Sequence, residues 1–175
     1  MVRLFRRWRL PADRRPALEP EERVLDWARV DGTDAVIVAT NRGLWLPGRD
    51  RRLGWHEIHK AVWSGTELAI TPAAVVEERD RYQVVVDQPV ESFRLPDPGD
   101  VPHHVRARVT ASVAYSLHHR LDPGGVRVVG RRVSGVDGLR WMVRYDPGTD
   151  LASPQVRQRT DELVLQAQLA ANPSL

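Results

Sequence analysis

Short runs of alternating hydrophobic and polar residues, with one nearly continuous apolar run at 35–40, fill the first half of the chain. They span 24–30, 35–40, 44–46, 59–63, 67–71, 82–87 and 90–95, with turn residues about every 6–12 positions. Alternation with a period of two indicates strands that bury one face. Seven such strands predict an antiparallel sandwich or small barrel. The last two runs lie on either side of Gln88-Pro89 and are expected to pair as a hairpin.

A helical pattern follows Asp100. Pro102 lies where the first turn of a helix tolerates proline. Apolar residues then recur every four positions: Val105, Val109, Val113 and Leu117. This spacing predicts one amphipathic helix over 102–119 that lays its apolar stripe on the barrel. His103-His104 and His118-His119 would then lie at opposite ends of that helix, too far apart to share a metal ion.

The last third of the chain predicts a second hairpin and a final helix. Strands are expected over 126–133 and 139–145, joined by a turn at 134–138. In the second of these strands the apolar side chains share one face: Leu139, Trp141, Val143 and Tyr145. Ser153 as N-cap and Pro154 at the first position begin the final helix, and Asn172-Pro173 ends it.

The stretch 41–63 holds three of the six tryptophans: Trp45, Trp55 and Trp63. Large aromatic side chains are strong core anchors. Trp45 and Trp63 fall on predicted strands, and Trp55 begins a connecting turn that is expected to plug the barrel. We therefore interpret most of this stretch as core and barrel closure.

Three phrases here resemble those of bacterial pleckstrin-homology (PH)-like domains: Thr40-Asn41-Arg42-Gly43-Leu44-Trp45, Trp55-His56-Glu57-Ile58 and Ala61-Val62-Trp63. The chain also resembles small uncharacterised actinobacterial proteins, through Asp97-Pro98-Gly99-Asp100, Val105-Arg106-Ala107-Arg108-Val109 and Arg131-Arg132-Val133. The resemblance implies a mainly β (α+β) protein. It would be a PH-like antiparallel barrel capped by a helix, with a C-terminal β-hairpin and helix as an extension.

Such a fold predicts three parts. They are a basic N-terminal arm and linker (1–23), the PH-like barrel with its capping helix (24–119), and a hairpin and C-terminal helix packed on it (120–175). PH-like barrels bind peptides at an open strand edge, or lipids and anions at a loop end. Eukaryotic PH domains bind inositol phosphates through a basic loop between their first two strands. Here the corresponding loop, Asp31-Gly32-Thr33-Asp34, is acidic, so that route is not expected.

Charge is unevenly distributed along the 175 residues, whose net charge is +3. Residues 1–16 carry six arginines against Asp13, residues 77–100 carry seven acids against three arginines, and residues 101–144 carry eight arginines against two aspartates. Lys60 is the only lysine. This separation of charge permits an anionic partner. The absence of cysteine excludes disulfides, thiolate metal sites and cysteine nucleophiles, and fits a cytoplasmic setting.

The predicted C-terminal hairpin is rich in arginine. Five positions are candidates for binding an anion or a partner: Arg127, Arg131, Arg132, Arg140 and Arg144. One register places Arg132 opposite Arg140, and a slip by one residue places Arg131 opposite Arg140 and Arg127 opposite Arg144. Like charges directly opposite are destabilising. An acid from 77–100, stacking on Trp141, or an external anion could offset them.

The N-terminal segment 1–10 predicts a short basic amphipathic helix. Apolar side chains share one side and arginines spread over the other; the candidate membrane contacts are Leu4, Phe5, Trp8, Arg3, Arg6, Arg7 and Arg9. The alternatives are an arm that docks Phe5 and Trp8 on the domain, or contact with nucleic acid. The last is disfavoured because the basic segments lack interleaved exposed aromatics for stacking.

No catalytic or cofactor motif is present: neither G-x-S-x-G nor G-x-G-x-x-G nor a P-loop occurs. His56 and His59 have a helical spacing but lack a third zinc ligand nearby. We therefore expect no enzyme, no metal and no cofactor. The sequence favours a non-catalytic binding or scaffold module of the bacterial cytoplasm that recognises a protein or an anionic partner.

Two alternatives remain open. One is a peripheral membrane-surface protein anchored by the basic N-terminus. The other is a small-ligand-binding or enzymatic barrel built around Trp45, Trp55, His56 and His59.

Overall fold

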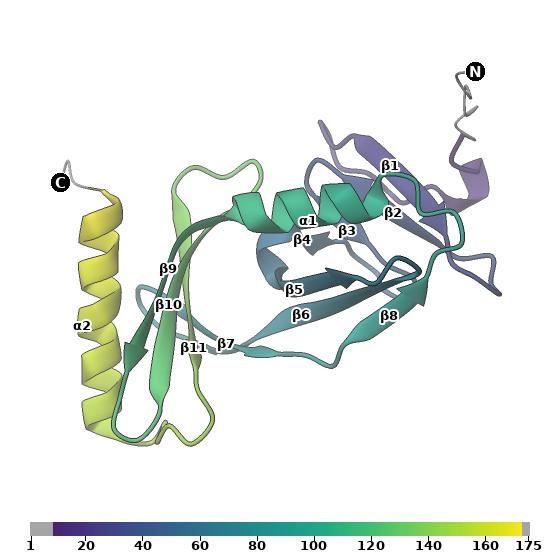
Figure 1. Ribbon diagram of the computed structural model, residues 1–175. Helices are drawn as coiled ribbons and strands as arrows, with labels where there is room; N and C mark the ends of the chain where they lie inside the picture. Colours follow the sequence, from purple (N-terminus) through teal and green to yellow (C-terminus); the bar gives the residue numbers. More distant parts are fainter. Residues whose placement is uncertain (1–8, 173–175) are drawn as a thin grey trace.

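The computed structural model describes residues 9–172, and it is a mainly β, α+β protein with two sheets and two α-helices (Figure 1). One sheet has four antiparallel strands in chain order: β1 (Val24–Arg29), β2 (Val36–Thr40), β3 (Gly43–Trp45) and β4 (Leu53–Gly54). Gly43 is required where β3 meets β4, because a Cβ there would collide with the carbonyl group of Leu53. The glycine of the Arg-Gly-Leu phrase is thus explained by close backbone approach.

The second sheet has seven strands. In order, they are β5 (Ile58–Trp63), β6 (Glu67–Glu78), β7 (Gln83–Asp87), β11 (Leu139–Tyr145), β10 (Gly125–Arg132) and β9 (Val113–Arg120), and β8 (Glu91–Arg94) also pairs with β6. The β7–β11 pair is parallel, whereas the other pairs are antiparallel.

Strand β6 changes its partners at Pro72. Its first half lies between β5 and β8, and its second half, from Ala73 onward, pairs with β7. The sheet therefore curls from a half-barrel into a separate C-terminal layer (Figure 1). The expected hairpin of 82–87 with 90–95 is wrong, because β7 and β8 each pair with a different half of β6.

The half-barrel, the four-stranded sheet and helix α1 (Val101–Ser112) enclose one core. Ile37 and Leu44 come from the first sheet, Ile70 from β6 and Val105 from α1, and all are fully buried. Trp55, in a 3₁₀ turn (Trp55–Glu57), is buried among them, and its indole N–H donates to the Thr40 carbonyl at 3.2 Å. The prediction that Trp55 lies in the core is confirmed.

The predicted helix over 102–119 is wrong in its second half. Helix α1 ends at Ser112, and the chain continues directly as strand β9, which pairs with β10. Valines and a leucine spaced by four satisfy a period of two as well as a helical period, so the pattern alone did not separate the states. Pairing with β10 stabilises the strand, so His118 and His119 lie on β9 and not at the end of α1.

Helix α2 (Pro154–Ala171) covers one face of the C-terminal layer. The Ser153 hydroxyl accepts from the Val156 amide, which confirms the predicted N-cap. A second core lies between α2 and the strands, formed by Val128, Trp141, Val143 and Leu163 among others. The predicted hairpin at the end of the chain is confirmed as β10–β11.

Candidate binding surfaces

The face of the β10–β11 hairpin that α2 leaves uncovered carries four of the five candidate arginines. Their register places Arg127 opposite Arg144 and Arg131 opposite Arg140, which is the second of the two registers expected. We call these four residues the arginine face. Arg132 lies on the opposite face of β10, and its Nη1 donates to the Ala111 carbonyl at 2.9 Å.

Arg131 is the buried member of the arginine face, with 6% of its surface exposed. Its Nη1 donates to Ser112 Oγ at 2.7 Å, and its Nη2 donates to the Ile58 carbonyl at 3.3 Å. The side chain thus reaches from β10 to the end of α1 and the start of β5. Burial lowers the pKa of this guanidinium, and the nearby charge of Arg144 lowers it further.

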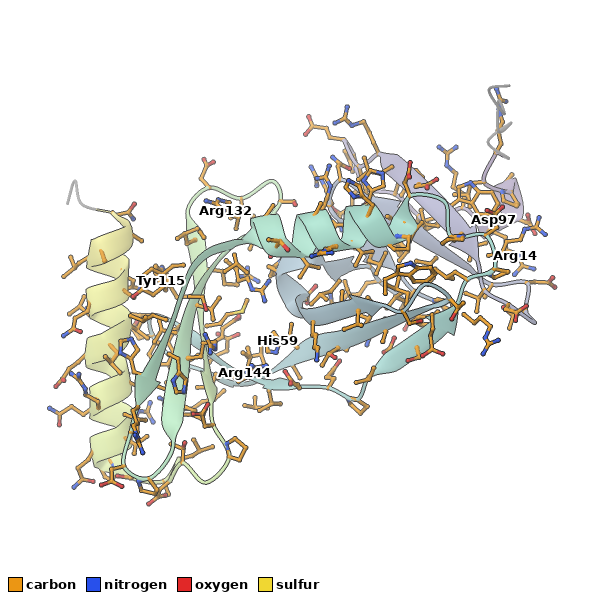
Figure 2. The ribbon with its side chains drawn as sticks, in the orientation of Figure 1. Arg14, His59, Asp97, Tyr115, Arg132 and Arg144 are labelled. Atoms are coloured by element: carbon orange, nitrogen blue, oxygen red, sulfur yellow. The ribbon has the colours of Figure 1, made fainter. Side chains whose placement is uncertain are left out.

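Arg144 belongs to a chain of ion pairs that joins the two parts of the second sheet. Its Nη1 lies 2.9 Å from Asp87 Oδ1, and the same oxygen lies 2.6 Å from His59 Nδ1. Figure 2 shows His59 of β5 and Arg144 of β11 on facing sides of the same junction. An acid from 77–100 therefore offsets Arg144, as one of the sequence alternatives proposed.

The ion-pair chain shifts the titration of its members. Burial lowers the pKa of His59, and Asp87 opposes that effect by hydrogen bonding. Burial acts to raise the pKa of Asp87, but the hydrogen bonds from His59 and Arg144 outweigh it and bring that pKa below its ordinary value. The carboxylate is thus held in its charged form.

His56 lies beside the arginine face. Burial lowers its pKa to about 4, with Arg140 and Arg131 adding to the effect and Glu57 opposing it. Arg140 itself is exposed and makes no hydrogen bond or ion pair within the described residues. Arg127 donates to Ser116 Oγ at 3.3 Å. The electrostatic field at this junction is therefore positive.

A second surface, which the sequence did not predict, lies between β5 and α1. It is a groove of about 630 Å³, lined by Ala61, Val62, Trp63, Leu68, Pro98, Gly99, Pro102, His103, Val105 and Arg106. Val62 of β5 is 44% exposed and contributes apolar surface to this groove. No pattern in the sequence indicated this groove, because a sequence does not show which strand ends a sheet or which helix packs beside it.

Other predicted site residues are less informative. Leu4, Phe5, Trp8, Arg3, Arg6 and Arg7 lie outside the described residues, and Arg9 is exposed. Over the described part of the chain, no helix is long and apolar enough to cross a membrane. Within 9–172, no group of three or more acidic or histidine side chains could hold a metal ion.

The residues of the predicted ligand barrel have separate partners. The Trp45 indole donates to Glu22 Oε1 at 3.1 Å, Trp55 donates to the Thr40 carbonyl, and His59 is paired with Asp87. Glu22 also accepts from the Thr40 hydroxyl at 2.7 Å and from Arg52 at 3.1 Å. These polar contacts link structural elements to one another.

Comparison with known proteins found no match among family models, curated proteins or solved structures. Function is therefore inferred from the arginine face and the β5–α1 groove.

Proposed function

We propose that this protein is a PH-like, non-catalytic binding module that recognises a protein partner by adding an extended peptide along β5. The four-stranded sheet, the half-barrel and α1 around one core support the PH-like part of the proposal. The single observation that carries the function is that β5 ends the second sheet beside the β5–α1 groove.

Strand β5 pairs with β6 on one side and with no strand on the other within residues 9–172. An unpaired strand edge presents backbone N–H and C=O groups that can pair with another chain. Helix α1 packs beside β5 (Figure 1), and side chains of both elements line the groove. Peptide addition at a sheet edge takes affinity from main-chain hydrogen bonds and specificity from side-chain pockets.

The lining of the groove indicates the chemistry of that peptide. Val62 and Trp63 supply apolar surface, and Arg106 and His103 lie on the α1 side. Arg106 is exposed and makes no ion pair within the described residues. An extended peptide that alternates apolar and acidic residues matches this lining, because its side chains would reach the pocket and the arginine in turn.

The test uses a fluorescein-labelled peptide of alternating valine and glutamate as the probe. Wild-type protein is expected to raise its fluorescence anisotropy, and amide resonances of β5 are expected to shift in NMR spectra. A peptide of the same composition with proline in place of alternate valines should bind much more weakly, since proline removes the donors that strand addition needs.

Charge reversal supplies the matched comparison. Arg106→Glu is expected to weaken binding of the probe by about tenfold or more, which corresponds to one interfacial charge contact. Arg140→Glu makes the same charge change on the arginine face and should leave binding unchanged. Equal loss in both variants, or equal binding of the proline peptide, would contradict the proposal.

A further inference from the structure

The positive charges of the arginine face exceed the negative charges of the carboxylates close to it. Two cross-strand pairs, Arg127 with Arg144 and Arg131 with Arg140, place like charges directly opposite one another. Asp87 is already shared between Arg144 and His59. Over residues 9–172, no carboxylate lies within 4.0 Å of Arg127, Arg131 or Arg140.

This imbalance of charge is destabilising at Arg131, because its guanidinium is buried and its hydrogen-bond partners are neutral. Its two hydrogen bonds go to a hydroxyl and a backbone carbonyl, neither of which carries a compensating charge. A buried charge without a counter-charge is strongly unfavourable. Ser112 in turn donates to the Val109 carbonyl at 2.7 Å, so the partner that positions Arg131 is itself held in place.

We propose that Arg131 and Arg140 bind a small oxyanion of the phosphate class at the junction of β10, β11 and β5. His59 lies on the Arg131 side of this site, because it follows Ile58, whose carbonyl accepts from Arg131. The guanidinium group carries its donors in a planar fork that matches the oxygens of a phosphate. Arg131 supplies a fixed, desolvated donor, and exposed Arg140 supplies one that an anion reaches from solvent. This site lies apart from the β5–α1 groove and does not depend on peptide binding there.

The first experiment measures thermal unfolding of the full chain in inorganic phosphate against sodium chloride of equal ionic strength. Phosphate is expected to raise the Tm of the wild type by about 3 °C or more above the chloride reference, since a ligand that binds only the folded state stabilises it. Arg140→Gln should lose this excess. Arg106→Gln, which removes the same charge in the groove, should retain it.

A second measurement reports on the site even where a variant is less stable. The C2 proton of His59 is titrated by NMR with and without phosphate. A bound dianion close to the ring favours the imidazolium form, so the pKa of His59 is expected to rise by about half a unit or more in the wild type. The rise should be absent in Arg140→Gln, a result that a purely structural role of the arginine would not produce.

The source of the phosphate is separated by sedimentation with vesicles that contain phosphatidic acid. A response to inorganic phosphate without vesicle binding assigns the site to a free phosphate. A response to both, each lost in Arg140→Gln, assigns it to a headgroup. Equal effects of phosphate and chloride, or the same behaviour in Arg140→Gln and Arg106→Gln, would overturn the proposal.

Discussion

His59 on β5 and Asp87 at the end of β7 lie 2.6 Å apart, although 28 positions separate them in the chain. The contact connects the half-barrel to the C-terminal layer, because Asp87 also pairs with Arg144 of β11. Side chains from two other strands therefore converge on the Asp87 carboxylate.

Replacing Asp87 by asparagine is expected to lower the pKa of His59 further. The Asp87 carboxylate raises the pKa of His59 by hydrogen bonding and by charge, whereas burial, Arg144 and Arg131 lower it. NMR titration of the ring measures the change. Asp146→Asn is the control, since Asp146 contacts His118 rather than His59. A His59 pKa that is unchanged in Asp87→Asn would show that the pair does not exist in solution.

The stability of the protein is expected to fall as the pH decreases from about 6.5 towards 4. Folding lowers the pKa of His56 to about 4, so the unfolded chain binds the proton first and is stabilised relative to the folded chain across this window. Above the window the imidazole is neutral in both states and contributes no pH dependence. The depression corresponds to a loss of roughly 3 kcal/mol when the pH has fallen below both values.

Urea unfolding at several pH values tests this dependence. His56→Gln removes this titrating ring and should make the curve shallower between about pH 6.5 and 4, with a remaining slope from His59, whose pKa burial also lowers. His103→Gln changes an exposed histidine on α1 and should leave the wild-type slope. If the free energy of unfolding still falls steeply with decreasing pH in His56→Gln, groups other than His56 cause the loss.

Tyr82→Phe is expected to loosen the attachment of α2. The Tyr82 hydroxyl donates to Asp161 on α2 and accepts from Arg79 Nη1 at 2.7 Å. Loss of the hydroxyl removes two hydrogen bonds, but Arg79 keeps its bonds to Glu77 and Tyr145 and Asp161 is exposed to water. The expected cost is therefore about 1 kcal/mol. The free energy of unfolding from chemical denaturation measures this cost.

Tyr115→Phe provides the comparison for that variant. Tyr115 packs its ring on Trp141 at 5.5 Å, and its hydroxyl makes no hydrogen bond within the described residues. Its removal should change stability by no more than about 0.5 kcal/mol. Equal losses in the two variants would indicate that the network around Arg79 contributes nothing.

Local patterns predicted the strands well. The runs at 24–30, 35–40, 59–63 and 126–133 all correspond to strands, because alternation of apolar and polar residues is set by the pleat itself. The start of α2 was equally predictable, since Ser153 and Pro154 act on the first turn of the helix without help from elsewhere. The clustering of arginines on the last hairpin also followed from its register.

The long-range pairings could not be predicted in the same way. Whether 113–120 is helix or strand depended on β10, and the partner of β7 and β8 depended on the length of β6. The contacts of the candidate site residues were unpredictable for the same reason. The sequence by itself determined which residues are strand-forming, apolar or charged. Only the tertiary structure decided that Arg131 is buried beside Ile58 and that Asp87 pairs with His59 and Arg144. It also decided that β5 ends the second sheet within residues 9–172, because burial and pairing depend on neighbours distant in the chain.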